Sequence, residues 1–198
     1  MKKETINEIE VLTIGQKSDK VIIFIHGRGA DAQNILSLAR FFPEQQYFIA
    51  PNAKNNQWYP YSFLEPKEKN QPYLNESLEL LQKITKPFQK EHIYFAGFTQ
   101  GACLALEFIA KNPAKYGGVA ALSGGLIGDS LKGYKGDLKG TNIFLGCDEN
   151  DPFIPVSRVH ETEEVLKNLN ASVKKNIYSE LGHSINQDEI VEIKKVLK

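Results

Sequence analysis

The chain has 198 residues, and its 24 Lys and Arg side chains balance 24 Asp and Glu side chains. This balance lacks the basic excess typical of nucleic-acid binding, so no nucleic-acid partner is expected. A hydrophobic content of 41% can bury a core and excludes wholesale disorder, and the length fits a single domain over residues 1–198. Apolar runs such as Val21–Ile25 are far shorter than the ~20 residues that span a bilayer, so neither membrane insertion nor a signal peptide is expected.

Short apolar runs of strand length follow one another along the chain. Residues 6–14 alternate between apolar and polar and predict an early antiparallel strand. Residues 21–25 are continuously apolar and β-branched, which is typical of a strand buried on both faces. Residues 172–178 alternate again and predict a strand at the sheet edge. Four further strands of the buried kind are expected at residues 47–50, 92–96, 119–122 and 142–145.

Segments of helical period lie between these strands. The clearest, residues 74–88, places Leu74, Leu78, Leu81, Ile84 and Phe88 on one stripe. The other helices are expected at residues 32–41, 100–111, 156–169 and 188–197. Alternating strands and helices predict an α/β fold with right-handed crossovers and a mostly parallel sheet covered on both faces. Two long irregular stretches remain, at residues 51–72 and 124–140, and such loops are functional or mobile.

A G-x-x-x-G pattern occurs three times, but only residues 97–101 lie directly between an expected strand and an expected helix. This is the setting of a nucleophile elbow, in which the central residue has a strained positive φ. Glycines two residues before and two after the centre relieve contacts between the crossing backbones. Thr99 therefore occupies the expected nucleophile position.

Two candidate partners follow Thr99 in the order nucleophile, acid, histidine, which is that of the α/β hydrolases. Asp151 comes after the strand at 142–145, with Asp148 and Glu149 as near alternatives, and His183 comes after the strand that ends near residue 178. All three positions follow the carboxyl ends of strands, where open α/β sheets place their sites.

The three side chains suit nucleophilic acyl transfer. An alcohol is a weak nucleophile at neutral pH, so an imidazole, here His183, must accept the proton of the Thr99 hydroxyl. A carboxylate such as Asp151 then holds the imidazole tautomer and stabilises its cation. Backbone N–H groups must stabilise the oxyanion, and we expect them from Gln100, directly after Thr99, and from Arg28 in the loop after the first buried strand.

Five segments extend this pattern over nearly the whole chain: residues 25–31 (IHGRGAD), 57–63 (QWYPYSF), 97–101 (GFTQG), 122–125 (LSGG) and 182–189 (GHSINQDE). Together they resemble the phospholipase/carboxylesterase family of α/β hydrolases, which includes the acyl-protein thioesterases. The resemblance implies an α/β-hydrolase fold with a mostly parallel central sheet, helices on both faces and a minimal cap. It also implies a serine-esterase mechanism and a shallow acyl groove.

The chain departs from the family at the nucleophile, where Thr99 stands in place of serine. A β-branched residue at positive φ carries strain of about 1–3 kcal/mol. The additional methyl group restricts χ1 and crowds the reacting carbonyl. A barrier higher by ~3–4 kcal/mol would lower the rate by roughly 10²–10³. We therefore expect weakened activity.

Several other side chains are candidates for binding or support. Trp58 and Tyr59 belong to an aromatic loop that forms either a pocket wall or a satellite hydrophobic cluster. Phe153 and Ile154 follow the acid and are expected to line the same groove. The Arg28 side chain either attracts an anionic substrate or is merely solvated. We expect His26 to support the oxyanion loop and Cys103 to pack in the core. Ser123 is a weak alternative nucleophile.

The sequence thus predicts a carboxylic-ester or thioester hydrolase acting on small acyl substrates through a covalent acyl-enzyme. The alternative is a catalytically impaired protein of hydrolase fold that binds a small ligand, or an inactivated form of a serine esterase. No cofactor is expected, and no His, Cys and Asp cluster has metal-ligand spacing. The two cysteines are typical of buried thiols in a cytoplasmic protein. A homodimer is left open.

Overall fold

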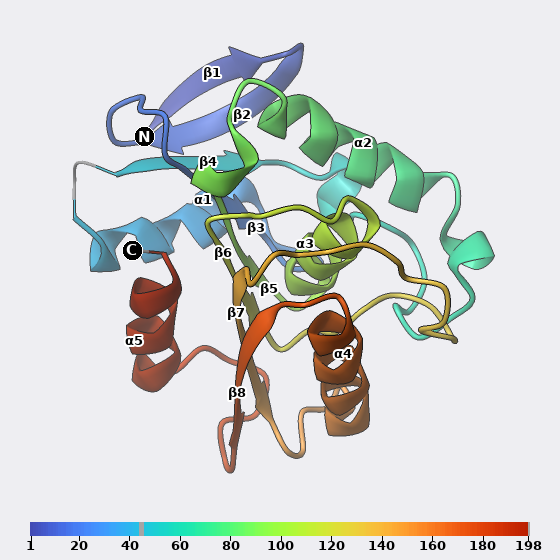
Figure 1. Cartoon of the computed structure of the whole chain (residues 1–198). Coiled ribbons are helices and arrows are strands. Elements are labelled where there is room, and N and C mark those ends of the chain that lie inside the picture. The colour runs from blue at the N-terminus through green and yellow to red at the C-terminus, as the bar shows by residue number, and fades with distance from the viewer. Residues whose placement is uncertain (44–45, 198) are drawn as a thin grey trace.

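The computed structural model of the chain describes residues 1–43 and 46–197, and its strands form one eight-stranded sheet (Figure 1). The strands are β1 (Lys2–Ile6), β2 (Ile9–Ile14), β3 (Val21–Ile25), β4 (Tyr47–Pro51), β5 (Ile93–Phe98), β6 (Gly118–Leu122), β7 (Asn142–Asp148) and β8 (Ser172–Tyr178). Their order is β1-β2-β4-β3-β5-β6-β7-β8. The pairs β1–β2 and β2–β4 are antiparallel, and the other pairs are parallel, which confirms the predicted sheet.

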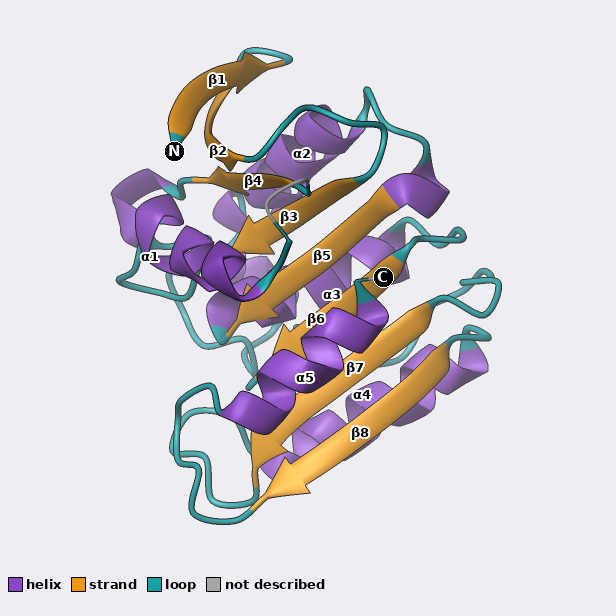
Figure 2. Ribbon diagram, turned by 90° about the vertical axis from the view of Figure 1, so that its left-hand side faces the viewer, coloured by secondary structure: helices purple, strands orange, loops and turns teal. Residues whose placement is uncertain are grey.

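Helices cover both faces of the sheet. They are α1 (Ala32–Leu36), α2 (Tyr73–Thr85), α3 (Gln100–Lys111), α4 (Val156–Asn168) and α5 (Gln187–Val196), with short 3₁₀ turns at Ser37–Phe41, Lys54–Asn56, Lys67–Asn70 and Lys90–His92. Figure 2 shows α1 and α5 on the near face, while α2, α3 and α4 lie behind the strands. The parallel strands all point toward the same edge of the sheet, and the loops that follow them gather there (Figure 2).

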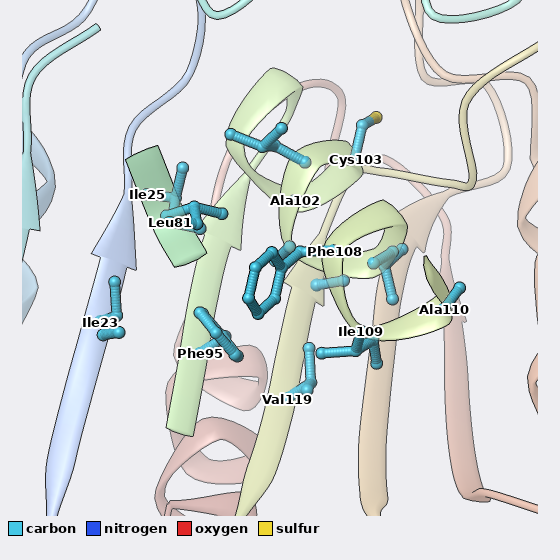
Figure 3. Packing of buried hydrophobic residues seen from close by; sticks show 14 of the residues in the cluster. Ile23, Ile25, Leu81, Phe95, Ala102, Cys103, Phe108, Ile109, Ala110 and Val119 are labelled. Carbon is cyan, nitrogen blue, oxygen red and sulfur yellow. The ribbon is translucent and has the colours of Figure 1, made fainter. Parts of the chain in front are cut away.

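The central strands are apolar on both faces because each face is covered by helices. Every residue of β3 is buried, and α3 is buried from Gln100 to Ala110. Figure 3 shows Phe108 of α3 packed against Phe95 of β5, with ring centroids 5.5 Å apart. This double-sided packing gives the ends of β3, β5 and β6 a rigid base.

The amino-terminal segment differs from its prediction. Residues 6–14 do not form one strand: the chain turns at Asn7 and Glu8, and Ile6 pairs with Ile9 across a two-residue loop. Both turn residues have positive φ, 45° and 70°, as a type I′ hairpin turn requires. The predicted antiparallel strand is present as β2, but its start was placed too early, because Glu8 stands where glycine is usual and because the preceding strand β1 is largely charged.

The two long irregular stretches are fastened to each other and to the core. The N–H of Gly128 donates to the carbonyl of Phe63 at 2.7 Å. From α4, Arg158 donates to the carbonyls of Leu126 and Gly128. The buried Glu107 of α3 accepts from Lys67 of the first stretch and Tyr134 of the second, at 2.8 and 2.5 Å. The two stretches therefore form one braced wall beside the carboxyl ends of the strands.

Candidate active site

Thr99 lies in the sharp turn between β5 and α3. Its backbone has φ 48° and ψ −116°, a strained conformation for a β-branched residue. Two hydrogen bonds hold it there: the Thr99 N–H donates to Leu122 O at the end of β6 (2.9 Å), and its carbonyl accepts from Cys103 N–H (3.0 Å). The turn thus presents the Thr99 side chain at the edge of the sheet where the strands end.

The glycines on either side of Thr99 are required by close backbone contacts. A Cβ added to Gly97 would lie 2.5 Å from the backbone of Gly101. A Cβ added to Gly101 would lie 2.1 Å from the carbonyl oxygen of Ile25 on β3. Helix α3 therefore crosses β5 and β3 at a distance that any side chain at these two positions would prevent.

The methyl group of Thr99 rests against Gly27, in the loop after β3. A Cβ added to Gly27 would lie 2.2 Å from Thr99 Cγ2, whereas its next neighbours, Phe98 O and Cδ1, are at 3.4 and 3.7 Å. Since these last two distances are ordinary contacts, the threonine methyl group is the single obstacle to a side chain at position 27 in the described part of the chain.

This contact predicts an energetic coupling between the two positions. We expect Gly27→Ala to destabilise the Thr99 protein and to cost far less in a Thr99→Ser background, with a coupling of about 1–3 kcal/mol. Urea unfolding of both single variants and the double variant measures it. Additive effects would show that the methyl group does not limit position 27.

Asp151 and His183 form a hydrogen-bonded pair. The Nδ1 of His183 lies 3.0 and 2.8 Å from Oδ1 and Oδ2 of Asp151. Asp151 Oδ1 also accepts the N–H groups of Phe153 and Ile154, at 2.9 and 3.0 Å. Burial acts to raise the pKa of Asp151, but the hydrogen bonds from His183 and Phe153 outweigh it and hold this pKa below its usual value. The ionised carboxylate thus keeps the proton on Nδ1 and leaves Nε2 as the basic atom.

The loop that carries His183 is fixed from two sides. Asp148 Oδ2 accepts the N–H groups of Leu181 and Gly182, at 2.6 and 3.1 Å. Asp148 is therefore a support for the loop, and of the three acids weighed from the sequence Asp151 is the one that reaches the imidazole. The rings of Phe98 and Phe153 lie 4.8 and 4.7 Å from the His183 ring and limit its rotation.

Thr99 and His183 line the same pocket. Within residues 1–43 and 46–197, the Thr99 hydroxyl makes no hydrogen bond to His183, and Nε2 of His183 has no partner. Catalytic hydrogen bonds in a free enzyme are often long and tighten only around substrate. The structure thus brings the three side chains to one site with the Asp–His pair formed and the hydroxyl unengaged.

The loop after β3 is held by the neutral side chain of His26. Its Nδ1 donates to Gly27 O (2.8 Å), and its Nε2 accepts from Ala53 N–H (3.1 Å). Burial lowers the pKa of His26, which keeps the ring neutral. The backbone carbonyl of His26 accepts the indole N–H of Trp58 at 2.8 Å. His26 therefore has the structural role expected from the sequence.

The backbone N–H groups of Arg28 and Gln100 have no acceptor among the described residues, and both residues line the pocket. The Gln100 side chain joins the turn to the aromatic loop: Oε1 accepts from Trp58 N–H and Nε2 donates to Tyr59 O, each at 2.8 Å. The unpaired N–H group of Gln100 is consequently held in place by the two hydrogen bonds of its own side chain.

The pocket around Thr99 has a volume of about 550 Å³. Tyr59, Phe153 and Ile154 line it. The structure places Trp58 elsewhere: its side chain is buried behind the wall, because its indole N–H takes the carbonyl of His26 as acceptor. Ser123 is fully buried and outside the lining, which removes it as an alternative nucleophile.

Some lining residues were missed by the sequence reasoning. Phe98 lies inside the turn motif itself, next to Thr99, so its position was a usable signal. Ile35 lies in the helix expected at residues 32–41, and Tyr61 lies in the aromatic loop, but neither was singled out as a pocket residue. Cys103 also lines the pocket, but burial raises the pKa of its thiol to about 12, so it stays protonated.

Other features of the described chain do not compete with this site. A hollow of about 500 Å³ lies between α2 and α3, lined by Phe88 and Lys86 among others, and it contains no paired nucleophile and imidazole. No group of three His, Cys, Asp or Glu side chains in the described ranges is arranged to hold a metal ion. None of the described helices is long and apolar enough to cross a membrane.

Helix α5 begins directly after the His183 loop with a buried carboxyl group. Asn186 and Glu189 form a capping box, in which Glu189 Oε2 accepts Asn186 N–H at 3.1 Å. Glu189 is fully buried, and its Oε1 has no hydrogen-bond partner within the described residues. Burial raises the pKa of Glu189 from 4.5 to about 7.

The raised pKa of Glu189 makes stability depend on pH. Because the folded state holds this proton more tightly than the unfolded state, its stabilising effect is complete below about pH 4.5 and is lost as the pH rises through 7. Glu189→Gln keeps the cap and stays neutral at both pH values. We therefore expect its free energy of unfolding, relative to that of wild type, to rise by roughly 2–4 kcal/mol between pH 4 and pH 8. Urea unfolding at both pH values checks this, with the exposed Glu164→Gln as control. An unchanged pH dependence would contradict it.

The sheet, the strained turn and the Asp–His pair define an α/β hydrolase. The chain belongs to the phospholipase/carboxylesterase family, whose model matches residues 6–198, and it is accordingly a hydrolase. A phospholipase/carboxylesterase structure from Dyadobacter fermentans is 40% identical, covers 98% of this chain and 99% of its own, and superposes with a TM-score of 0.91. The acyl-protein thioesterases 1 of Candida albicans and Saccharomyces cerevisiae are 25% and 27% identical over 98% and 97% of this chain, and each alignment covers 97% of the relative.

Proposed function

We propose that the protein hydrolyses small carboxylic esters or thioesters, with Thr99 as nucleophile, His183 as general base and Asp151 as the group that orients His183. The observation that carries this proposal is the Asp151–His183 pair facing the same pocket as the strained turn at Thr99. The names of the fungal thioesterases, which align over nearly the whole chain, support including thioesters.

The reaction proceeds in two halves. The Thr99 hydroxyl oxygen attacks the carbonyl carbon of the substrate while His183 Nε2 accepts its proton. Collapse of the tetrahedral intermediate breaks the bond to the alcohol or thiol, which takes the proton from His183 and leaves an acyl ester on Thr99. Water then attacks this ester, again losing a proton to His183. The carboxylic acid leaves, and the proton returns to Thr99.

The tetrahedral intermediates carry negative charge on the former carbonyl oxygen. The backbone N–H groups of Arg28 and Gln100 are the donors for it, which is consistent with their lack of any acceptor in the described structure. Loss of one such donor typically costs about 10²–10³ in rate. The side chain of Gln100 is bound to the aromatic loop, so this donor is held in position before substrate arrives.

The pocket suits a small acyl group. Its volume of about 550 Å³ lies within the range usual for small-molecule sites, and Tyr59, Phe153 and Ile154 give it an apolar wall. Water and the ester are the reactants, and the chemistry needs no cofactor. Single-domain organisation over residues 1–198 and a cytoplasmic location are part of the proposal, the latter supported by the free, buried thiols of Cys103 and Cys147.

One observation favours a second candidate, a hydrolase-fold protein that binds a small ligand without efficient turnover. The Thr99 hydroxyl makes no hydrogen bond to His183 in the described structure, and the Thr99 methyl group occupies the space over Gly27. A hydroxyl held away from its base would bind an ester without activating the nucleophile.

Hydrolysis of p-nitrophenyl acetate and butyrate by wild type, Thr99→Ser and His183→Ala decides between the two. Saturable wild-type activity that His183→Ala abolishes supports the enzyme. Activity confined to Thr99→Ser supports the binding protein. Absence of turnover by wild type and Thr99→Ser, with p-nitrophenyl octanoate and an acyl thioester included as longer and sulfur-containing substrates, would overturn the proposed function.

A further inference from the structure

The guanidinium group of Arg28 is fixed at the wall of the pocket by four hydrogen bonds. Nη1 donates to Gln57 Oε1 (3.1 Å) and Pro60 O (2.8 Å). Nη2 donates to Tyr59 O (2.8 Å) and Tyr61 O (2.9 Å). A guanidinium group held in one orientation loses little further freedom when a ligand binds beside it. Arg28 is therefore a preorganised positive charge rather than a freely moving side chain.

This charge has no negative partner. All four acceptors are neutral, and no carboxylate forms an ion pair with Arg28 within residues 1–43 and 46–197. Asp31, three residues further on, uses its carboxylate to cap α1. No acidic side chain lines the pocket in the described structure, and Asp151 lies behind His183, outside the lining. The pocket thus carries a positive charge although the whole chain is neutral.

We propose that this site prefers small esters that carry a negatively charged group, with Arg28 as the residue that determines the preference. The inference rests on the proposed function and names its substrate class. An unpaired charge beside an apolar wall attracts an opposite charge more strongly than it would in bulk water. Since Arg28 is exposed and its charge is screened by solvent, we expect an anionic ester to exceed its neutral counterpart about three- to tenfold in kcat/KM.

The hydrogen bonds of Arg28 also limit how it recognises the anion. Four of the five guanidinium N–H groups are already used, so the two-pronged contact that arginine usually makes with a carboxylate is not available without releasing the loop. Recognition is therefore by charge and not by the shape of one anion. Carboxylate and phosphate groups should both be accepted.

Matched pairs of esters test the preference. On the acyl side, mono-p-nitrophenyl adipate is compared with its methyl ester, which has the same reacting group without the charge. On the alcohol side, the butyrate ester of 4-hydroxyphenylacetate is compared with that of its methyl ester. We expect wild type to favour the anion in at least one pair, and this preference to shrink when NaCl is raised from 50 to 500 mM.

Variants separate the charge of Arg28 from its structural role. Arg28→Gln removes the charge and should abolish the preference, whereas Arg28→Lys keeps the charge and should retain part of it. Loss of the loop contacts alone would lower turnover of both members of a pair equally, so the ratio within a pair is the readout. Lys54→Gln removes an exposed positive charge outside the pocket lining and should leave the ratio unchanged. Equal turnover of both members in both pairs, or a preference that Arg28→Gln retains, would overturn the proposal.

A binding measurement keeps the result independent of catalysis. Trp58 is the sole tryptophan of the chain, and its backbone N–H is bound to Gln100 at the pocket. Its fluorescence can report titration with monomethyl adipate, an anion, and dimethyl adipate, its neutral counterpart. Tighter binding of the anion, if it is lost in Arg28→Gln, supports the inference even when no ester is hydrolysed. Absence of hydrolysis would overturn the proposed function alone. Equal binding of both esters overturns the inference.

Discussion

Replacing Thr99 by serine is expected to raise kcat about 100- to 1,000-fold while changing KM little. The serine hydroxyl keeps the nucleophile, and loss of the methyl group frees χ1 and removes a carbon atom from the space where the carbonyl must approach. The contact of Cγ2 with Gly27 shows where that carbon lies, beside the loop that includes Arg28. Steady-state hydrolysis of p-nitrophenyl butyrate measures the change.

The control for this prediction is Thr99→Ala, which removes hydroxyl and methyl together and should lower activity to that of His183→Ala. A serine variant no faster than wild type would show that the threonine methyl group does not limit the reaction. A fast Thr99→Ala variant would show that the nucleophile lies elsewhere.

Replacing Asp151 by asparagine is expected to lower kcat about 10³- to 10⁴-fold with little change in the free energy of unfolding. Asparagine keeps the shape of the side chain, but its amide turns the imidazole to the wrong tautomer and cannot stabilise the imidazolium cation. The decrease in kcat is best measured in the Thr99→Ser background, where the higher starting activity makes a large decrease detectable. Proton NMR follows the same change, since the strongly hydrogen-bonded Nδ1 proton of His183 should disappear.

Asp137→Asn is the matched control for this substitution, because Asp137 is an exposed residue of the 124–140 stretch and accepts hydrogen bonds only from Lys139 and Asn170 among the described residues. It should leave kcat within a factor of about two. If Asp151→Asn kept more than a tenth of the parental activity, the orienting role of the carboxylate would be refuted.

The elements with strong local signals were predicted from the sequence. The strand at residues 21–25 and the helix at 100–111 have the observed bounds, because continuous apolar residues and an uninterrupted helical stripe leave few alternatives. The turn at Thr99 was predicted for a similar reason: two glycines four positions apart between a strand and a helix are typical of a nucleophile elbow.

The rest depended on contacts between distant segments. Asp148 and Asp151 both follow β7, and which of them reaches His183 is decided by the path of the loop and not by the local sequence. An aromatic residue in a loop, such as Trp58, faces the core or the pocket according to where its polar atom finds an acceptor. The hairpin at Asn7 and Glu8 was missed because a left-handed glutamate has no sequence signature.

The braced wall beside the strand ends has a consequence for how a substrate is chosen. Arg28 and Gln100 fasten the aromatic loop, and Gly128 joins it to the second long stretch. A pocket entrance held by this many hydrogen bonds keeps one shape, so it does not close around a bound substrate. Substrates are then selected when they first meet the pocket, by whether they fit its fixed opening and are attracted by its positive charge. Binding does not wait for a loop to open.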